Sequence, residues 1–318
     1  MVEPLRLELR DGVSQARVWA ALAVVYVVWG STYLGILLAI DTIPVFLSMG
    51  IRFVIAGGLL YVWAVRRGDI TSDGVGRRQW LAAAVVGGLL FVGGNSLVAW
   101  SETRVDTGIA ALLIAAVPLW MALFDRVANG QGLSRSALLG LLVGFSGVAL
   151  LAWPSGPSRI DALGAVALLV SGAAWAAGSL VARRAALPRR PLVSSGMQMF
   201  AGGMLLMLVA SASGELTDVG RPSLTSVLAM VYLVVFGSWL AFSAYAWLLQ
   251  VAPTSVVSTY AYVNPVVAVF LGWGVLSEPL SVRTIAAGTV ILGAVALIVT
   301  PARVRPAPAP ATAPVRAQ

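Results

Sequence analysis

Arg52 is a charged residue well inside an apolar stretch of the sequence. It lies roughly 12 Å along a helix from Pro44 at the usual helical rise. Burying an arginine in a bilayer costs at least about 2.5–3.5 kcal/mol, so its side chain should face protein or water. Arg52 can bind or gate a solute, or it can form a structural ion pair or extend to the interface. Its candidate partners are Glu102, Asp106 and Glu278.

Two of these carboxylates suggest proton chemistry. Glu102 follows the third apolar run and Glu278 precedes the tenth. A carboxyl group exposed alternately to two sides of a membrane can load and release a proton, and so couple solute movement to a proton gradient. The alternative is a loop carboxylate that caps a helix or pairs with arginine. Capping is favoured for Glu278, because Pro279 and Ser281 follow it before the next run. The absence of acidic residues mid-membrane weakens the case for coupling.

Several uncharged polar side chains also fall at the depth of the apolar runs. In hydrocarbon each needs a partner, so most should point into a bundle. Asn264 is the best candidate, since Pro265 lacks an N–H and frees a carbonyl one turn earlier. An amide beside that carbonyl can hold a polar ligand, or it can form a hydrogen bond between helices. The other residues of this kind are Asn95, Gln198, Tyr245, Tyr260 and Tyr262.

Three tryptophans, Trp29, Trp175 and Trp239, lie near the middle of apolar runs. Their rings can line a cavity for apolar or cationic solutes through stacking or cation–π contacts, or they can simply pack. Trp29 and Trp175 carry more weight, because they correspond in the internal repeat described below. The polar side chains beside Trp29 on its face or the next turn are Ser31, Thr32 and Tyr33.

Pro118 and Pro265 lie inside the fourth and ninth runs at corresponding positions. A proline within a helix removes one hydrogen bond and bends the axis. We expect both to kink their helices, either as a mechanical element or as a static bend.

Small residues recur in the fifth and tenth runs and permit close helix approach. We favour packing of these two helices on each other over formation of a homodimer. Both a monomer and a homodimer stay open as expected states. The glycines concerned are Gly140, Gly144, Gly147, Gly288 and Gly293.

The composition excludes most enzymatic chemistry. Cysteine and histidine are absent, which removes thiolate nucleophiles, disulfides and the usual zinc ligands and general base. All 21 basic residues are arginine, so neither a P-loop nor a Schiff base can form. We expect no metal and no cofactor.

The elements that must position these residues are membrane helices. Apolar residues make up 59% of the chain and charged residues 11%, with a mean hydropathy of +0.91. About 20 apolar residues cross a bilayer as a helix. Ten runs of sufficient length predict an all-α integral membrane protein: 18–40, 44–65, 80–100, 105–124, 136–153, 160–182, 191–211, 224–249, 254–276 and 284–300.

The net charge of +8 comes from arginines clustered between the runs, which predicts membrane topology rather than nucleic-acid binding. Most of them lie on the side that holds both ends of the chain, and this side should be cytoplasmic in a cell membrane. Residues 1–17 are then a cytoplasmic segment, and the Pro-Ala-rich tail 301–318 is expected to be disordered. The opposite side holds Arg104, Arg159, Arg221 and Arg283.

The chain repeats itself at an offset of 147 positions, which divides it into 18–153 and 160–300. Five helices per repeat place the second copy upside down, an arrangement typical of secondary transporters. The least accidental matches are Pro44 with Pro191, Trp100 with Trp247 and Pro118 with Pro265.

The sequence resembles the EamA family of the drug/metabolite transporter superfamily, and within it the YedA-like exporters. The similarity rests on residues 29–33, Arg52-Phe53, 108–118, 260–265 and 278–281. It implies two inverted repeats around a central cavity, and export of amino acids, small metabolites or drugs.

Four functional classes remain to be compared. We favour a secondary exporter of a small molecule that works by alternating access, with proton coupling as an open question. The alternative within transport is a facilitator or importer of a small metabolite. An embedded lipid-modifying enzyme is less favoured, because no nucleophile and base can be paired without His, Cys and Lys. A membrane scaffold would not need Arg52 or Asn264 at their positions.

Overall fold

A computed structural model describes residues 13–68, 75–129, 135–153, 159–217, 219–252, 254–257 and 259–299. Most of the expected cytoplasmic segment 1–17 and the whole tail 301–318 lie outside the described residues, so the expectations for them stay untested.

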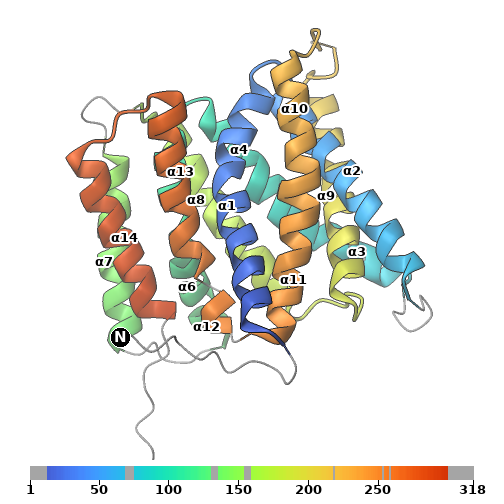
Figure 1. Ribbon diagram of the computed structural model, residues 1–318, viewed down its shortest axis with the longest axis horizontal. Helices are drawn as coiled ribbons and strands as arrows, with labels where there is room; N and C mark the ends of the chain where they lie inside the picture. Colours follow the sequence, from blue (N-terminus) through green and yellow to red (C-terminus); the bar gives the residue numbers. More distant parts are fainter. Residues whose placement is uncertain are drawn as a thin grey trace, which may run out of the picture.

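The described chain is helical, and its apolar helices account for ten spans, as the sequence predicts (Figure 1). Seven helical stretches are long and apolar enough to cross a membrane, and shorter apolar helices supply the fifth, ninth and tenth spans. The helices are α1 (Gln15–Ile40), α2 (Val45–Arg66), α3 (Arg77–Gly87), η2 (Gly88–Asn95), α4 (Ser96–Glu102), α5 (Thr107–Ile114), α6 (Val117–Asn129), α7 (Arg135–Ala152), α8 (Ala162–Ala182), α9 (Pro191–Ala212), α10 (Leu224–Tyr232), η3 (Leu233–Leu240), α11 (Ala241–Val251), α12 (Thr254–Val257), α13 (Tyr260–Leu276) and α14 (Val282–Val299).

Some spans consist of more than one helix. The third span joins α3, η2 and α4, and the eighth joins α10, η3 and α11. The fourth span divides between α5 and α6 at Ala115, next to Pro118. The ninth span has the short α12 ahead of α13, and Pro265 lies inside α13. Because interrupted helices expose backbone groups, these spans are the ones able to build a polar site.

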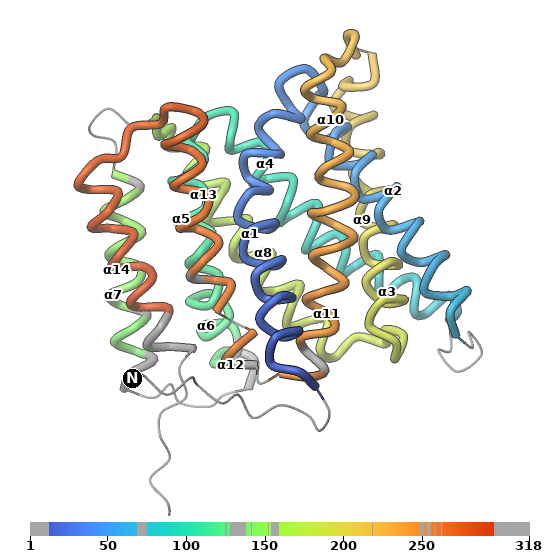
Figure 2. Tube along the Cα trace, viewed as in Figure 1, coloured from blue at the N-terminus to red at the C-terminus, as the bar shows by residue number. Residues whose placement is uncertain are grey.

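The two repeats run in opposite directions. At one end of the bundle, Arg190 Nη1 donates to the carbonyl of Ala64, 2.9 Å away. At the other end, the amide of Leu47 donates to Glu215 Oε2 at 2.8 Å. The start of α2 therefore meets the end of α9, and the two are antiparallel. Since each is the second helix of its repeat, the repeats are inverted (Figure 2).

Glycine permits the close contact of α2 with α9. A Cβ atom on Gly57 would overlap the backbone nitrogen of Phe200, and one on Gly203 would lie 2.6 Å from the nitrogen of Val54. On the opposite side of the bundle, α7 packs against α14. A Cβ on Gly147 would lie 2.9 Å from Cγ1 of Val290. Gly144 and Gly147 thus serve packing of the fifth helix on the tenth, as favoured above, whereas Gly288 faces Leu112 of α5 and Gly293 has no neighbouring atom within 4 Å.

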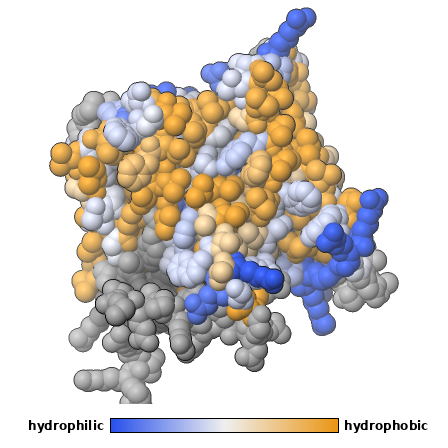
Figure 3. All heavy atoms as spheres, in the orientation of Figure 1, coloured by the Kyte–Doolittle hydropathy of each residue, from blue (hydrophilic) through white to orange (hydrophobic). Residues whose placement is uncertain are grey.

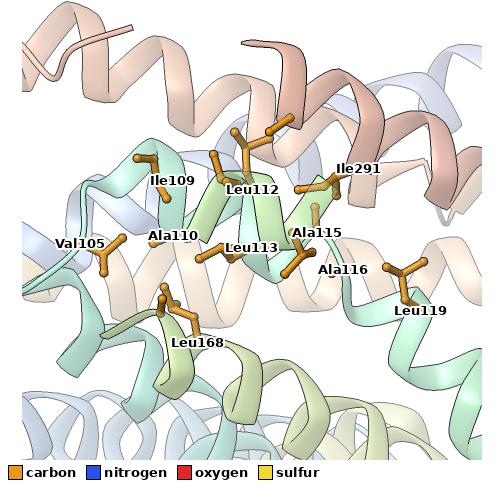
Figure 4. Close-up of a cluster of buried hydrophobic side chains, with 14 of the residues drawn as sticks. Val105, Ile109, Ala110, Leu112, Leu113, Ala115, Ala116, Leu119, Leu168 and Ile291 are labelled. Atoms are coloured by element: carbon orange, nitrogen blue, oxygen red, sulfur yellow. The ribbon is translucent and has the colours of Figure 1, made fainter. Parts of the chain in front are cut away.

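The two largest of four buried apolar clusters among the described residues lie on either side of the bundle. One lies among α5, α6, α8 and α14, where Leu113 and Leu119 meet Leu168 and Ile291 (Figure 4). The other joins α1 and α2 to α9 and both η segments. Burying one large apolar side chain stabilises a fold by roughly 1.5–3 kcal/mol. The face seen in Figure 3 is also apolar over its middle, with polar groups toward both ends, as a protein in lipid requires.

Candidate functional site

Two π-helical segments lie at the centre of the bundle. η2 interrupts the third span and η3 interrupts the eighth, which are corresponding helices of the two repeats. A π turn widens the helix and redirects its carbonyls, and such turns concentrate at functional sites. Each segment faces the central tryptophan of the opposite repeat. Trp29 Nε1 donates to the Gly237 carbonyl at 3.1 Å, and a Cβ on Gly94 would lie 3.0 Å from Trp175 Cε3.

Four aromatic rings meet beside η3, and we call them the aromatic cluster: Trp29, Phe242, Tyr245 and Tyr260. The ring of Trp29 is 5.1 Å from Tyr245, 5.2 Å from Tyr260 and 6.0 Å from Phe242, measured between centroids. Tyr245 and Tyr260 also meet edge to face at 5.7 Å. The cluster joins the first span of repeat 1 to the eighth and ninth spans of repeat 2. It can accommodate an apolar or cationic group if the rings separate.

Asn264 connects the same helices through its amide. With its nitrogen oriented toward the available acceptors, Asn264 donates to the backbone oxygens of Tyr26 and Tyr260, at 3.2 Å each. Close by, the hydroxyl of Tyr26 is hydrogen-bonded to that of Thr259. Asn264 therefore forms the hydrogen bond between helices that was one of its two expected roles.

Arg52 points into the bundle rather than to the interface. It is 4% exposed, and its Nε donates to Ser238 Oγ in η3 at 2.9 Å. A Cβ on Gly237 would lie 3.3 Å from Nη2, so a small residue admits the guanidinium here. Among the described residues, Arg52 has no ion pair within 4.0 Å and its Nη1 has no hydrogen-bond partner. Glu102 acts on it electrostatically from a greater distance.

Glu102 is the last residue of α4 and is completely buried. Neither carboxylate oxygen has a hydrogen-bond partner in the described part of the chain. The charges of Arg52 and Glu278 both act on it, and Tyr33 is close enough to feel its charge. The structure thus rules out an exposed loop carboxylate at this position.

Glu278 caps a helix, but not the one expected. Its two carboxylate oxygens accept from the amides of Thr107 at 2.6 Å and Gly108 at 3.0 Å, at the start of α5. The following helix, α14, is capped instead by Ser281, which accepts from the Thr284 amide at 3.0 Å. Because α5 belongs to repeat 1 and Glu278 to repeat 2, this cap ties the repeats together at one end.

Asp106 is another charged group at the end of the bundle that holds Glu278. Its Oδ2 accepts from the Arg159 amide at 2.9 Å, and Arg159 Nε lies 3.9 Å from Oδ1. Burial raises the pKa of Asp106, and the charge of Glu278 raises it further against the opposing effect of Arg159. Asp106 and Glu278 both line a pocket of about 10 Å³ between α5 and α13, roughly the room of one water molecule.

The remaining candidates lie in different places. Ser31 is hydrogen-bonded at 2.6 Å to Tyr232, which directly precedes η3, and a Cβ on Gly237 of η3 would lie 3.0 Å from Cγ2 of Thr32, so both lie beside η3. Trp239 lies apart from the aromatic cluster; it is 37% exposed and meets Trp63 edge to face. Further candidates are Asn95 at the end of η2, Gln198, which donates to Ser194 in its own helix, and Tyr262, whose side chain lies outside the described atoms.

Sequence reasoning missed Phe242, Ser238 and Tyr232. Each lies one or two turns from a residue that was chosen, and none stands out as charged or repeat-related. The small pair Gly237-Ser238, like Gly93-Gly94 in the corresponding helix, was the signal available for the π segments.

Comparison with known proteins agrees with this architecture. The EamA-like transporter family matches residues 17–153 and 162–300. The inner membrane transporter YedA of Escherichia coli K12 is 36% identical over 279 residues, covering 87% of this chain and 89% of YedA. The transporter YvbV of Bacillus subtilis is 23% identical, covering 91% and 93%.

A solved crystal structure has the same fold, with a TM-score of 0.60 and 19% sequence identity over 89% of this chain and 96% of that one. The two matches of one family to the two inverted halves, together with the similarity to YedA, decide the classification. This chain is a multi-pass membrane protein and belongs to the EamA-like transporter family.

Proposed function

We propose that this protein is a secondary transporter that exports small metabolites, amino acids or drug-like compounds from the cell by alternating access. The observation that supports it best is the paired contact at the centre of the bundle. Trp29 lies against η3 and Trp175 against η2, so each repeat holds the π segment of the other. Two inverted repeats joined in this way can rock between two related arrangements around a central site.

The aromatic cluster and Arg52 are the proposed binding surface. Gly237 and Ser238, neighbours in η3, bind Trp29 and Arg52 respectively. Aromatic faces and a buried guanidinium next to each other suit a solute with an apolar body and an anionic group. In the present conformation the rings fill the space between them, so opening the site requires α1 to move relative to α11 and α13.

The distribution of arginines supports the proposal that both ends of the chain lie on the cytoplasmic side of the membrane. Arg66, Arg77 and Arg183 lie at the same end of the bundle as the start of α1, and Arg159 lies at the other. By the positive-inside tendency, the first end is cytoplasmic and the end with Glu278 is the outer end. The contact of Glu278 with α5 then means that the outer end is closed here.

Counterflow in proteoliposomes tests the transport proposal. Vesicles loaded with one unlabelled compound are diluted into its labelled form, across a panel of amino acids and cationic dyes. We expect saturable uptake for at least one compound. Trp29→Ala should raise the half-saturating concentration about tenfold, the equivalent of about 1.4 kcal/mol.

The matched control is Trp19→Ala, because Trp19 is in the same helix but 47% exposed at its end. Flux that never saturates for any compound would remove the proposal. Saturable flux that runs only toward the cytoplasmic end of the protein would favour an importer or facilitator in its place.

A further inference from the structure

The buried carboxyl group of Glu102 makes no hydrogen bond that would stabilise the fold among the described residues. Its exposed fraction is 0%, and among the described residues neither Oε1 nor Oε2 meets a hydrogen-bond donor. A buried carboxylate without partners is strongly unfavourable, whereas the neutral acid avoids most of that cost. The group is therefore suited to hold a proton while it is enclosed.

The charges around Glu102 oppose each other. Arg52 and Glu278, which carry opposite charges, both act on it. Arg52 is not within 4.0 Å, and Arg159 Nη2 donates at 3.0 Å to the backbone carbonyl of Glu102 rather than to its carboxylate. Protonation thus depends on where Glu278 lies. The titratable and charged groups nearest to Glu102 are Arg52 on α2, Tyr33 on α1, Glu278 between α13 and α14, Asp106 before α5 and Arg159 before α8.

A backbone turn at Ser277 fixes the position of Glu278. Ser277 adopts a left-handed conformation (φ 58°), a strained state for a residue other than glycine. This turn directs the Glu278 amide to the Gly272 carbonyl at 3.0 Å and folds the side chain back over α13. A Cβ on Gly272 would lie 2.9 Å from Cδ of Glu278. The carboxylate therefore reaches the start of α5, and we call this contact the outer latch.

We propose that Glu102 is a proton-binding site and that its proton keeps the outer latch closed. The neutral acid does not repel Glu278, which remains on the amides of Thr107 and Gly108. When the proton leaves, the new carboxylate repels Glu278 and attracts Arg52, which favours separation of α5 from α13. This inference rests on the proposed export function and names the proton as its coupling ion. A proton bound from outside closes the outer end and crosses inward as solute leaves.

Infrared titration of the purified full-length protein in nanodiscs tests the site without any solute. We expect a carboxylic-acid C=O band that disappears as the pH rises, and that is missing from Glu102→Gln. The control Asp41→Asn removes an exposed carboxylate and should keep the band. A wild-type minus Glu102→Gln difference spectrum without a titrating C=O band would contradict the proposal.

Spin labels test the link between the proton and the outer latch. The chain has no cysteine, so labels at Thr103→Cys and Leu280→Cys report on the two sides of the latch without further changes. We expect the distance between the labels to lengthen as the pH rises, and to stay short at every pH in Glu102→Gln. An equal pH response in both proteins would refute the link.

A second variant covers the case in which Glu102→Gln is not inserted into the membrane. Glu102→Asp keeps the titratable group and should shift the pH midpoint of the distance change; an unchanged midpoint counts against the site.

Failure of the export proposal gives a different result. Absence of saturable counterflow with the infrared and distance changes intact would leave the proton site standing, and saturable flux without those changes would remove only the proton site.

Discussion

Buried polar residues at the centre are satisfied across the repeats rather than within one. Arg52 and Trp29 belong to repeat 1, and both are held by η3 of repeat 2. Each pairing satisfies a group that would be costly to leave in hydrocarbon. Nη1 of Arg52, by contrast, is buried and has no hydrogen-bond partner among the described residues.

Replacement of Arg52 tests this residue-scale argument. Arg52→Met keeps most of the side-chain length but removes the charge and the bond to Ser238. A hydrogen bond to a charged group is worth about 1.5–3 kcal/mol, so we expect transport at low solute concentration to fall about ten- to hundredfold. The measurement is counterflow with equal amounts of reconstituted protein. The control Arg104→Met changes an exposed arginine that stacks on Trp100; wild-type kinetics in Arg52→Met would exclude Arg52 from the site.

Single residues show the limit of what the sequence predicts. Arg52 and Asn264 stand out because polar groups are rare in apolar runs, and the structure places both in the bundle. Capping by Glu278 was predicted, but its caps on Thr107 and Gly108 of α5 were not, because these residues are distant in sequence and meet Glu278 only in the folded bundle. The burial of Glu102 was equally open, since the end of a helix can face either the interface or the bundle.

Among the elements, α2 and α9 form a close helix pair that depends on glycine. At Gly57 and Gly203 the backbones approach too closely for any side chain. Such contacts rely on small residues, because lipid supplies no hydrophobic drive for association between helices. The pair fixes α2, and therefore Arg52, against the second repeat.

A single added methyl group should loosen this pair. In Gly57→Ala, the new Cβ overlaps the backbone of Phe200, and overpacking of this kind costs about 1–3 kcal/mol. We expect a lower melting temperature in detergent by fluorescence-detected thermal unfolding. The control is Gly274→Ala on α13, where no atom lies within 4 Å of the added Cβ. Equal melting temperatures for the two variants would show that α2 and α9 are not in close contact.

Helix locations were predictable, and helix irregularities were not. The ten spans follow from run length alone, although α1 begins at Gln15 rather than at 18 and α14 at Val282 rather than at 284. Run length does not reveal the π segments, and the small pairs Gly93-Gly94 and Gly237-Ser238 are only a weak signal for them, because a π turn depends on tertiary contacts.

For the whole molecule, the repeat in the sequence explains both the architecture and the proposed mechanism. An odd number of spans in each repeat makes inversion unavoidable, and the antiparallel contact of α2 with α9 shows it. The outer latch has closed one end, while Tyr26 and Thr259 meet nearer the other. Transport by alternating access, as proposed above, requires the two ends to open in turn and therefore a second state with the outer latch released.

Paired distance measurements on the two ends test this requirement most directly. One pair of spin labels at Thr103→Cys and Leu280→Cys reports on the outer end, and another at Arg17→Cys and Arg183→Cys reports on the other. Across pH and added solute, the account predicts that one distance lengthens as the other shortens. Two distances that stay fixed, or that lengthen together, would contradict alternating access by these repeats.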